Sequence, residues 1–246
     1  VQALCALTKK QGVLYAKLVE QLKADLANKN LPPNQRRGLV LGYLIKFKQV
    51  CNHPSHWSGD GRFEPEDSGK FLRLAEIAAE LAERCLVFTQ FREMTDPLSQ
   101  HLERVFGRPG LVLHGDTPVR QRAGLVERFQ QPDGPPFFVL SVKAGGTGLT
   151  LTAANHVIHF DRWWNPAVEN QATDRAFRIG QKRNVLVHKF VCPGTIEEKV
   201  DALITAKAAL AEDLIGGEAG AEKLLTDMSN EELLEFVRLD IRSAVV

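Results

Sequence analysis

The residues best suited to bind phosphate lie in a glycine-rich segment that follows an apolar run near the middle of the chain. The segment reads Ser141-Val142-Lys143-Ala144-Gly145-Gly146-Thr147-Gly148. Glycines and small hydroxyl residues let backbone N–H groups approach an anion closely where a strand ends and a helix begins. Because no Gly-Lys-Ser/Thr sequence ends the segment, it is not a Walker A loop, and the phosphate need not be that of ATP. A tight strand-to-helix turn without a ligand is the alternative interpretation.

A second set of chemically active side chains recurs at helical spacing in residues 166–179. Gln171, Asp174, Arg175 and Arg178 are spaced i, i+3, i+4 and i+7, so a continuous helix would present them on one face. Two guanidinium groups one turn apart suit a phosphoryl group in transition, because each stays charged and donates two parallel hydrogen bonds. The pattern therefore indicates phosphate chemistry, with an ordinary solvated charged face as the alternative.

Cysteine and histidine spacing does not indicate metal chemistry. Cys51, His53 and His56 lie close together, but no second Cys or His pair at finger spacing follows them. The four cysteines contain no Cys-x-x-Cys pair, as is typical of a protein in a reducing cytosol. They are Cys5, Cys51, Cys85 and Cys192. We therefore expect a cytoplasmic protein without a metal site.

Size and charge limit what kind of protein this chain can be. It has 246 residues, of which 44% are hydrophobic, enough for one large or two small domains with a core. Lysine and arginine number 31 against 30 aspartates and glutamates, so any contact with nucleic acid must be local. No run of about eighteen apolar residues and no export signal is present, so we expect no membrane partner. The chain begins with Val1 rather than methionine, and we expect it to be part of a longer protein.

Short β-branched runs alternate with helical segments from residue 69 onward, which is the pattern of a parallel sheet with helices on its faces. The expected strands are residues 85–89, 111–114, 137–142, 156–161 and 185–191. The expected helices are residues 69–83, 91–106, 118–130, 147–153 and 166–179. The sequence thus predicts an α/β fold whose strand-end loops gather the phosphate-binding residues at one edge of the sheet.

Helical periodicity also flanks this region on both sides. Apolar residues recur at helical spacing in residues 12–28, 34–51 and 196–214, and Ser229 and Glu232 form a capping box for a last helix, 229–239. The expected organisation is a helical protrusion (1–57), a loop (58–69), a sheet-containing lobe (70–194) and a helical tail (195–246).

Several motifs together resemble the second RecA-like lobe of the SWI/SNF-type ATPases within helicase superfamily two, in a bacterial-looking form. They are Cys51-Asn52-His53-Pro54, Leu86-Val87-Phe88-Thr89-Gln90-Phe91, His114-Gly115 through Arg122 to Phe129, the glycine-rich segment, Asp161-Arg162-Trp163-Trp164-Asn165-Pro166 and residues 171–181. The match covers nearly the whole chain, and the combination is highly specific, whereas the glycine-rich segment alone is not. The resemblance implies a RecA-like α/β lobe with a helical N-terminal protrusion and a helical C-terminal tail.

The resemblance also implies roles for the matching residues. Arg175 and Arg178 would be arginine fingers that reach ATP and Mg²⁺ held mainly by an absent first lobe, with Gln171 and Asp174 positioning them. Gly146 and Gly148 would line the nucleotide side of the interface. The residues implied to hold DNA are Thr89, Gln90, Gly115, Arg122, Ser141, Lys143, Gly145 and Trp164. For Trp163 and Trp164, which follow a strand, a place in the core is the alternative.

Two positions depart from the family pattern, and one helix has two interpretations. Asp116 stands where a small or hydroxyl residue is more frequent, and Thr150 stands where Asn is frequent, so neither is assigned a function. The helix that contains Glu197-Glu198-Lys199 resembles a brace that leans on the first lobe, but it equally fits a helix that covers the sheet.

The function that the resemblance implies is half of an ATP-dependent translocase or remodeller of double-stranded DNA, nucleoid-associated in a bacterium. The implied partners are duplex DNA, the N-terminal RecA-like lobe of the same polypeptide, and a cargo such as a nucleoprotein or RNA polymerase. The chain alone, without a Walker A lysine and an acidic pair for magnesium, is expected to be inactive as an ATPase. The alternatives are a non-catalytic nucleic-acid-binding module and a lobe of a strand-separating or RNA-directed helicase of the same superfamily.

Overall fold

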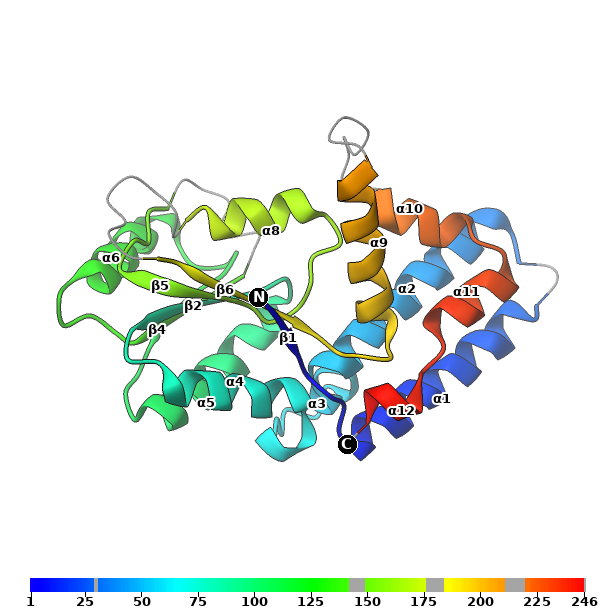
Figure 1. The fold of residues 1–246 in the computed structure, drawn as a ribbon, viewed down its shortest axis with the longest axis horizontal. Coiled ribbons are helices and arrows are strands. Elements are labelled where there is room, and N and C mark those ends of the chain that lie inside the picture. Colours follow the sequence, from blue (N-terminus) through cyan, green and yellow to red (C-terminus); the bar gives the residue numbers. More distant parts are fainter. Residues whose placement is uncertain (29–30, 142–148, 176–183, 211–219, 246) are drawn as a thin grey trace. The chain divides into compact units, whose positions relative to one another are not determined.

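The computed structural model describes residues 1–28, 31–141, 149–175, 184–210 and 220–245, which form two compact units (Figure 1). One unit, here called the sheet unit, contains Val1–Ala3 and Phe71–Phe190. The other, the helical unit, contains Leu4–Lys70 and Val191–Val246. Helices from before and after the sheet therefore belong to one unit, although most of the sheet unit lies between them in the sequence.

The sheet has six strands in the order β1-β6-β5-β2-β4-β3. From β6 to β3, every neighbouring pair is parallel, as the alternation of strands and helices predicts. The strands are β1 (Gln2–Leu4), β2 (Arg84–Thr89), β3 (Leu111–Leu113), β4 (Phe137–Ser141), β5 (Ala154–His159) and β6 (Leu186–Val191). The edge strand β1 was not predicted from the sequence, because a three-residue strand is too short to show a period.

The central strands β2 and β4 are buried on both faces, which is why their sequences are continuous apolar runs. On one face, Leu86 and Phe88 pack with Phe138, Phe129 and Ala172 in a single core cluster, so α6 (Val119–Gln130) and α8 (Pro166–Thr173) cover that face. Figure 1 shows α4 (Gly69–Glu80) and α5 (Thr95–Phe106) on the opposite face. The expected α/β architecture with helices on both faces is confirmed.

The helical unit is built around Tyr15, which no solvent reaches. Its ring lies 4.7 Å from that of Phe47, and its hydroxyl donates to the Val237 carbonyl and accepts from the Ile196 N–H. Seven α-helices lie entirely within the described part of this unit: α1 (Lys9–Leu26), α2 (Pro33–Asn52), α3 (Pro54–Ser58), α9 (Ile196–Leu210), α10 (Gly220–Asp227), α11 (Asn230–Val237) and α12 (Ile241–Ala244). One side chain thus joins the N-terminal helices to both ends of the tail.

Helix caps explain where two of these helices begin. Thr8 and Gln11 form a capping box at the start of α1. Ser229 and Glu232 form the second box, at the start of α11, as the sequence predicts. The predicted loop 58–69 contains a short 3₁₀ helix, Pro65–Asp67.

Three predicted helices differ from the observed ones. Residues 149–153 are not helical, since the Leu151 N–H donates to the Arg175 carbonyl and the Ala153 N–H donates to the Gln130 side chain. The helix predicted for residues 166–179 ends at Thr173. The one predicted from residue 91 begins at Thr95, after a 3₁₀ turn at Arg92–Met94.

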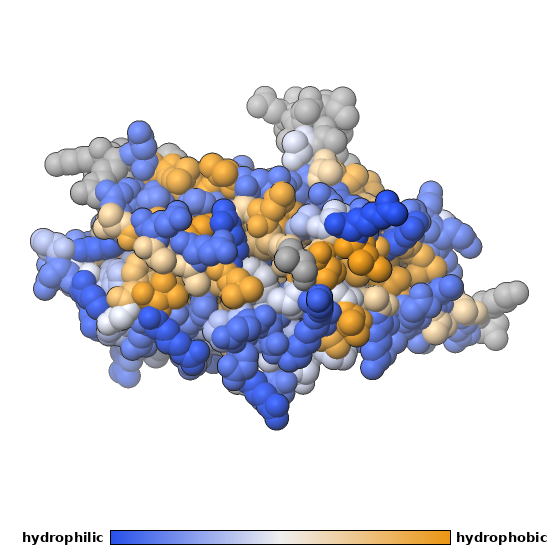
Figure 2. Space-filling model, turned by 60° about the horizontal axis from the view of Figure 1, so that its bottom comes forward, coloured by the Kyte–Doolittle hydropathy of each residue, from blue (hydrophilic) through white to orange (hydrophobic). Residues whose placement is uncertain are grey.

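Exposed large hydrophobic side chains are distributed over several elements, and Figure 2 shows orange hydrophobic groups lying between blue hydrophilic residues. Such scattered residues are normal at a protein surface and need no partner to explain them. Among the residues that the structure describes, no helix is long and apolar enough to cross a membrane.

Candidate functional site

Residues at the carboxyl ends of the parallel strands form the candidate site. Thr89, the last residue of β2, lies opposite Ser141, the last residue of β4, and both are buried. The loops that follow these strands therefore start at the same edge of the sheet, where α/β proteins bind their ligands. Gly115 follows β3 at this edge and is exposed.

The loop after β2 is fixed by a carboxylate that follows β5. Asp161 accepts a hydrogen bond from the Thr89 hydroxyl with Oδ2 and one of 2.9 Å from the Gln90 N–H with Oδ1. Asp161 is buried, so both bonds are shielded from water. The predicted contact residues Thr89 and Gln90 are thus held by a residue that was not predicted as part of the site.

The loop after β3 is held by Arg122. Its Nε donates to the Thr117 carbonyl and its Nη2 donates to the Gly115 carbonyl, each at 3.0 Å. The His114 N–H donates to the Thr117 hydroxyl and closes the same turn. Arg122 and Gly115 are therefore neighbours, as expected of residues that act together. Two of the N–H donors of Arg122 stabilise the conformation of the loop.

The predicted finger region differs from a single helical face. Because α8 ends at Thr173, Asp174 and Arg175 follow it in a turn, and the prediction that both continue the helix with Gln171 is wrong. Arg175 is only 4% exposed, whereas Gln171 and Asp174 are exposed. The Arg175 carbonyl accepts the Leu151 N–H at 3.0 Å, which ties this turn to the segment that follows the glycine-rich residues.

Five of the predicted site residues lie outside the described residues. They are Lys143, Gly145, Gly146, Gly148 and Arg178. Their flanking residues Ser141, Leu149 and Arg175 are described, and all belong to the sheet unit.

The sequence patterns did not predict a buried charge network around Glu169. Its Oε1 accepts hydrogen bonds from Arg162 Nε at 2.6 Å and from the Trp163 N–H at 2.9 Å, and Lys189 Nζ lies 3.1 Å from Oε2. Burial alone would raise the pKa of Glu169, but the charge and hydrogen bond of Arg162, with His159 and Lys189, lower it. The available signal was helical spacing, which places Glu169 three residues before Ala172, on the buried side of α8.

The same network fixes the turn that carries the two tryptophans. Trp163 and Trp164 are both half-buried, so neither the core nor the surface interpretation describes them fully. Next to this turn, His159 bonds the Thr173 hydroxyl at 2.8 Å, and burial lowers its pKa from 6.5 to about 4. The imidazole is therefore neutral in the folded protein at neutral pH.

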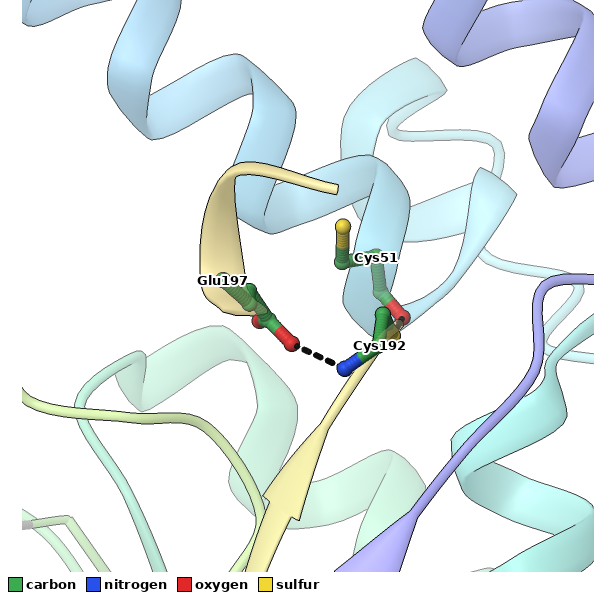
Figure 3. A group of neighbouring side chains, drawn as sticks. All are labelled: Cys51, Cys192 and Glu197. Carbon is green, nitrogen blue, oxygen red and sulfur yellow. Dashed lines mark hydrogen bonds between the residues drawn. The ribbon is translucent and has the colours of Figure 1, made fainter. Parts of the chain in front are cut away.

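In the helical unit, Cys51, Cys192 and Glu197 place one potential metal-ligand atom each within 4.8 Å of one another (Figure 3). Glu197 is already paired, because Oε1 lies 2.7 Å from Lys70 Nζ and Oε2 accepts the Cys192 N–H. Burial raises the pKa of the Cys192 thiol, which opposes the thiolate that a metal needs. The nearby ammonium of Lys70 further disfavours a dication, so we propose no metal here.

His53, which lies close to Cys51 in the sequence, has a structural role. Its Nδ1 accepts the Ser55 N–H and caps α3, while Nε2 lies 2.9 Å from the Glu64 carbonyl. Both ring nitrogens are thereby used in holding the turn at Cys51-Asn52-His53-Pro54.

Comparison with known proteins assigns the family. The family described as "Helicase conserved C-terminal domain" matches residues 69–180. The solved C-terminal domain of the Sulfolobus solfataricus SWI2/SNF2 ATPase matches with a TM-score of 0.80 and 35% identity over 98% of each chain. This chain belongs to the SWI2/SNF2 ATPase family.

Two further similar proteins are longer than this chain. The Sulfolobus solfataricus SWI2/SNF2 ATPase core, solved in complex with double-stranded DNA, matches with a TM-score of 0.84 and 37% identity over 98% of this chain and 50% of that one. The putative ATP-dependent helicase/translocase YwqA of Bacillus subtilis (strain 168) is 43% identical over 238 residues, 95% of this chain and 25% of its own length. The chain thus spans about a quarter of that curated relative. The expected RecA-like SWI/SNF lobe is confirmed.

Proposed function

We propose that this domain is the second lobe of an ATP-dependent translocase of double-stranded DNA, to which it supplies DNA phosphate contacts and arginine fingers. The observation that carries the proposal is that two of the loops predicted to hold DNA leave the same edge of one parallel sheet, each fixed by its own hydrogen bonds. The match to an ATPase core solved with double-stranded DNA supports duplex DNA as the partner.

DNA binding on this proposal is a matter of local geometry rather than overall charge. The net charge of the chain is only +1, so long-range attraction contributes little. The exposed Gly115 loop would offer backbone N–H groups to phosphates of one strand. The loop after Thr89, with Gln90, would contact the same strand, together with Ser141, Lys143, Gly145 and Trp164. Such contacts fix the position of the protein on DNA without reading sequence.

The nucleotide would be contacted from the turn after α8. Arg175 and Arg178 would meet the phosphates of ATP when the two lobes close, with Gly146 and Gly148 beside them and Gln171 and Asp174 positioning them. The bond between Leu151 N–H and the Arg175 carbonyl supports this arrangement, because it joins the end of the glycine-rich region to the first finger. The glycine-rich region and Arg175 would then move together when the two lobes close.

ATP with Mg²⁺ would be held mainly by the first lobe, and its hydrolysis supplies the energy for movement. The residues of this domain would contribute positive charge to the transferred phosphoryl group only in the closed state. A group that acts mainly in the transition state raises turnover more than nucleotide affinity. Arginine fingers in other enzymes contribute roughly 10³ to 10⁵ in rate.

The proposal is tested on the full two-lobed protein by measuring ATP hydrolysis with duplex DNA, single-stranded DNA and RNA. Duplex DNA should stimulate most, and displacement of a triplex-forming strand should accompany hydrolysis. Arg178→Lys and Arg175→Ala should keep duplex binding and nucleotide affinity yet lose on the order of 10³-fold in turnover. Arg104→Ala, at an exposed position on α5, is the matched control.

Each possible failure has a separate meaning. Stimulation by RNA or only by single strands would contradict duplex DNA as the substrate. Full turnover in either arginine variant would remove its finger role, and a large fall in melting temperature would assign Arg175 to the core instead. This domain alone should hydrolyse ATP at the background rate.

A further inference from the structure

An exposed ion pair links the two loops that we propose to contact DNA. Arg92, in the 3₁₀ turn after β2, pairs through Nε with Oδ2 of Asp116, which follows β3. The strand β4 separates β2 from β3 in the sheet, so the pair bridges loops that are not neighbours in the strand order. The two side chains are 58% and 66% exposed, which leaves both in reach of a ligand.

The backbones of the two loops do not depend on this pair. Asp161 holds the Gln90 N–H on one side, and Arg122 holds the Gly115 and Thr117 carbonyls on the other. The Arg92–Asp116 pair is therefore an added link between loops that are already fixed. An exposed ion pair of this kind contributes little stability and is readily replaced.

A phosphate diester can replace the carboxylate as the partner of Arg92. The guanidinium group binds phosphate oxygens with two parallel hydrogen bonds, and binding releases counterions from the DNA. Asp116 would then be left as an unpaired anion close to a phosphate, which favours release.

We propose that Arg92 binds a phosphate of the DNA and that Asp116 competes with that phosphate for the guanidinium group. This inference rests on the proposed binding of duplex DNA by the two loops. Asp116 acts as an internal anion that binds Arg92 when no phosphate is bound, and this competition lowers the affinity for DNA. A weak, rapidly reversible grip suits a lobe that must release and rebind its track at each step.

The test uses the full two-lobed protein and a labelled duplex, with affinity measured by fluorescence anisotropy at several salt concentrations without nucleotide. Asp116→Asn should bind about threefold to fivefold more tightly, the factor that an exposed ion pair is worth. Arg92→Gln should bind more weakly and lose about one unit of the salt slope. In the Arg92→Gln background, Asp116→Asn should gain less, because no guanidinium group is left to release.

The exposed pair Arg73–Glu76 on α4 provides matched controls, Arg73→Gln and Glu76→Gln. Suppose that the wild-type protein binds duplex DNA but that Asp116→Asn and Arg92→Gln have the same duplex affinity as these controls. That result would overturn this inference and leave the proposed function standing. An equal gain from Asp116→Asn with and without Arg92 would also overturn it, since that is a long-range charge effect without competition. Absence of salt-sensitive duplex binding by the wild-type protein would instead contradict the proposed function.

Discussion

Thr89 and Asp161 are 72 residues apart in the sequence, yet the hydroxyl of the first donates to the carboxylate of the second across the ends of two adjacent parallel strands. The same carboxylate also accepts the Gln90 N–H. One side chain therefore decides how the chain leaves β2, and the loop geometry can be tested by removing it.

Asp161→Ala should lower the free energy of unfolding by about 2 kcal/mol, because it leaves a buried hydroxyl and a backbone N–H without their acceptor. It should also weaken duplex binding, since the Gln90 loop loses its anchor. Chemical denaturation and anisotropy measure the two effects. Thr89→Val removes the hydroxyl's bonds to Asp161 and to the Phe91 N–H but keeps the bond between Asp161 and the Gln90 N–H, so it should cost less DNA affinity. If both variants bind DNA like the wild type, the loop does not contact DNA.

Glu169 supports the turn at Arg162 and Trp163 from inside the sheet unit. Glu169→Gln should cost about 3–5 kcal/mol at pH 7, because Arg162, only 5% exposed, loses its buried counter-charge. The folded pKa of Glu169 is lowered, so its contribution is present above the unfolded value of 4.5 and is lost as the pH falls through the folded pKa. The stability difference between wild type and variant should therefore shrink in acid. A difference that is constant from pH 7 to pH 3 would contradict this.

His159 should make the sheet unit sensitive to mild acid. Its pKa is lowered from 6.5 to about 4 by burial, so between these values the unfolded chain binds a proton that the folded chain does not. Stability should therefore fall as the pH drops from 6.5 to 4, by up to about 3 kcal/mol from this residue. His159→Gln retains a polar partner for Thr173 and should flatten the curve over this range. Equal slopes in urea denaturation of wild type and variant would rule the residue out as the titrating group.

Lys70 and Glu197 form an ion pair in the helical unit with side chains 0% and 1% exposed. Lys70→Met should destabilise by about 3–5 kcal/mol, because a charged Glu197 remains buried without its partner. Adding Glu197→Gln should recover part of the loss, since the amide stays neutral and still accepts the Cys192 N–H. In the same double-mutant cycle, removing the exposed pair Arg73–Glu76 should cost less than about 1 kcal/mol of stability. A double variant no more stable than Lys70→Met would contradict an electrostatic origin.

The sheet could be predicted because its central strands are continuous apolar runs. In the structure these runs lie side by side, with Leu86 beside Phe138 and Phe88 beside Leu140. The end of α8 could not be predicted, because the Leu151 N–H that donates to the Arg175 carbonyl belongs to a distant segment. The same limit applies to β1, which becomes a strand only by pairing with β6.

Within the candidate site, loop positions such as Gly115 and Arg122 followed from motif resemblance, and the structure places them together. Asp161 and Glu169 escaped prediction as supporting residues, because a lone acidic residue shows its role only when its partners are known. Glu169 lies on α8, and its partners come from β6 and from the turn before α8. Spacing along one segment cannot reveal such a set.

The division of the helical unit into two distant segments has a consequence for synthesis on the ribosome. Residues 4–70 emerge before the rest of this domain, but Tyr15 finds the Ile196 and Val237 backbone groups only after Phe71–Phe190 has been made. At about 5–20 residues per second, that delay is on the order of ten seconds. During this time the apolar faces of α1 and α2 lack their partners from the tail, so within this domain these two helices are the most exposed to chaperones and to aggregation.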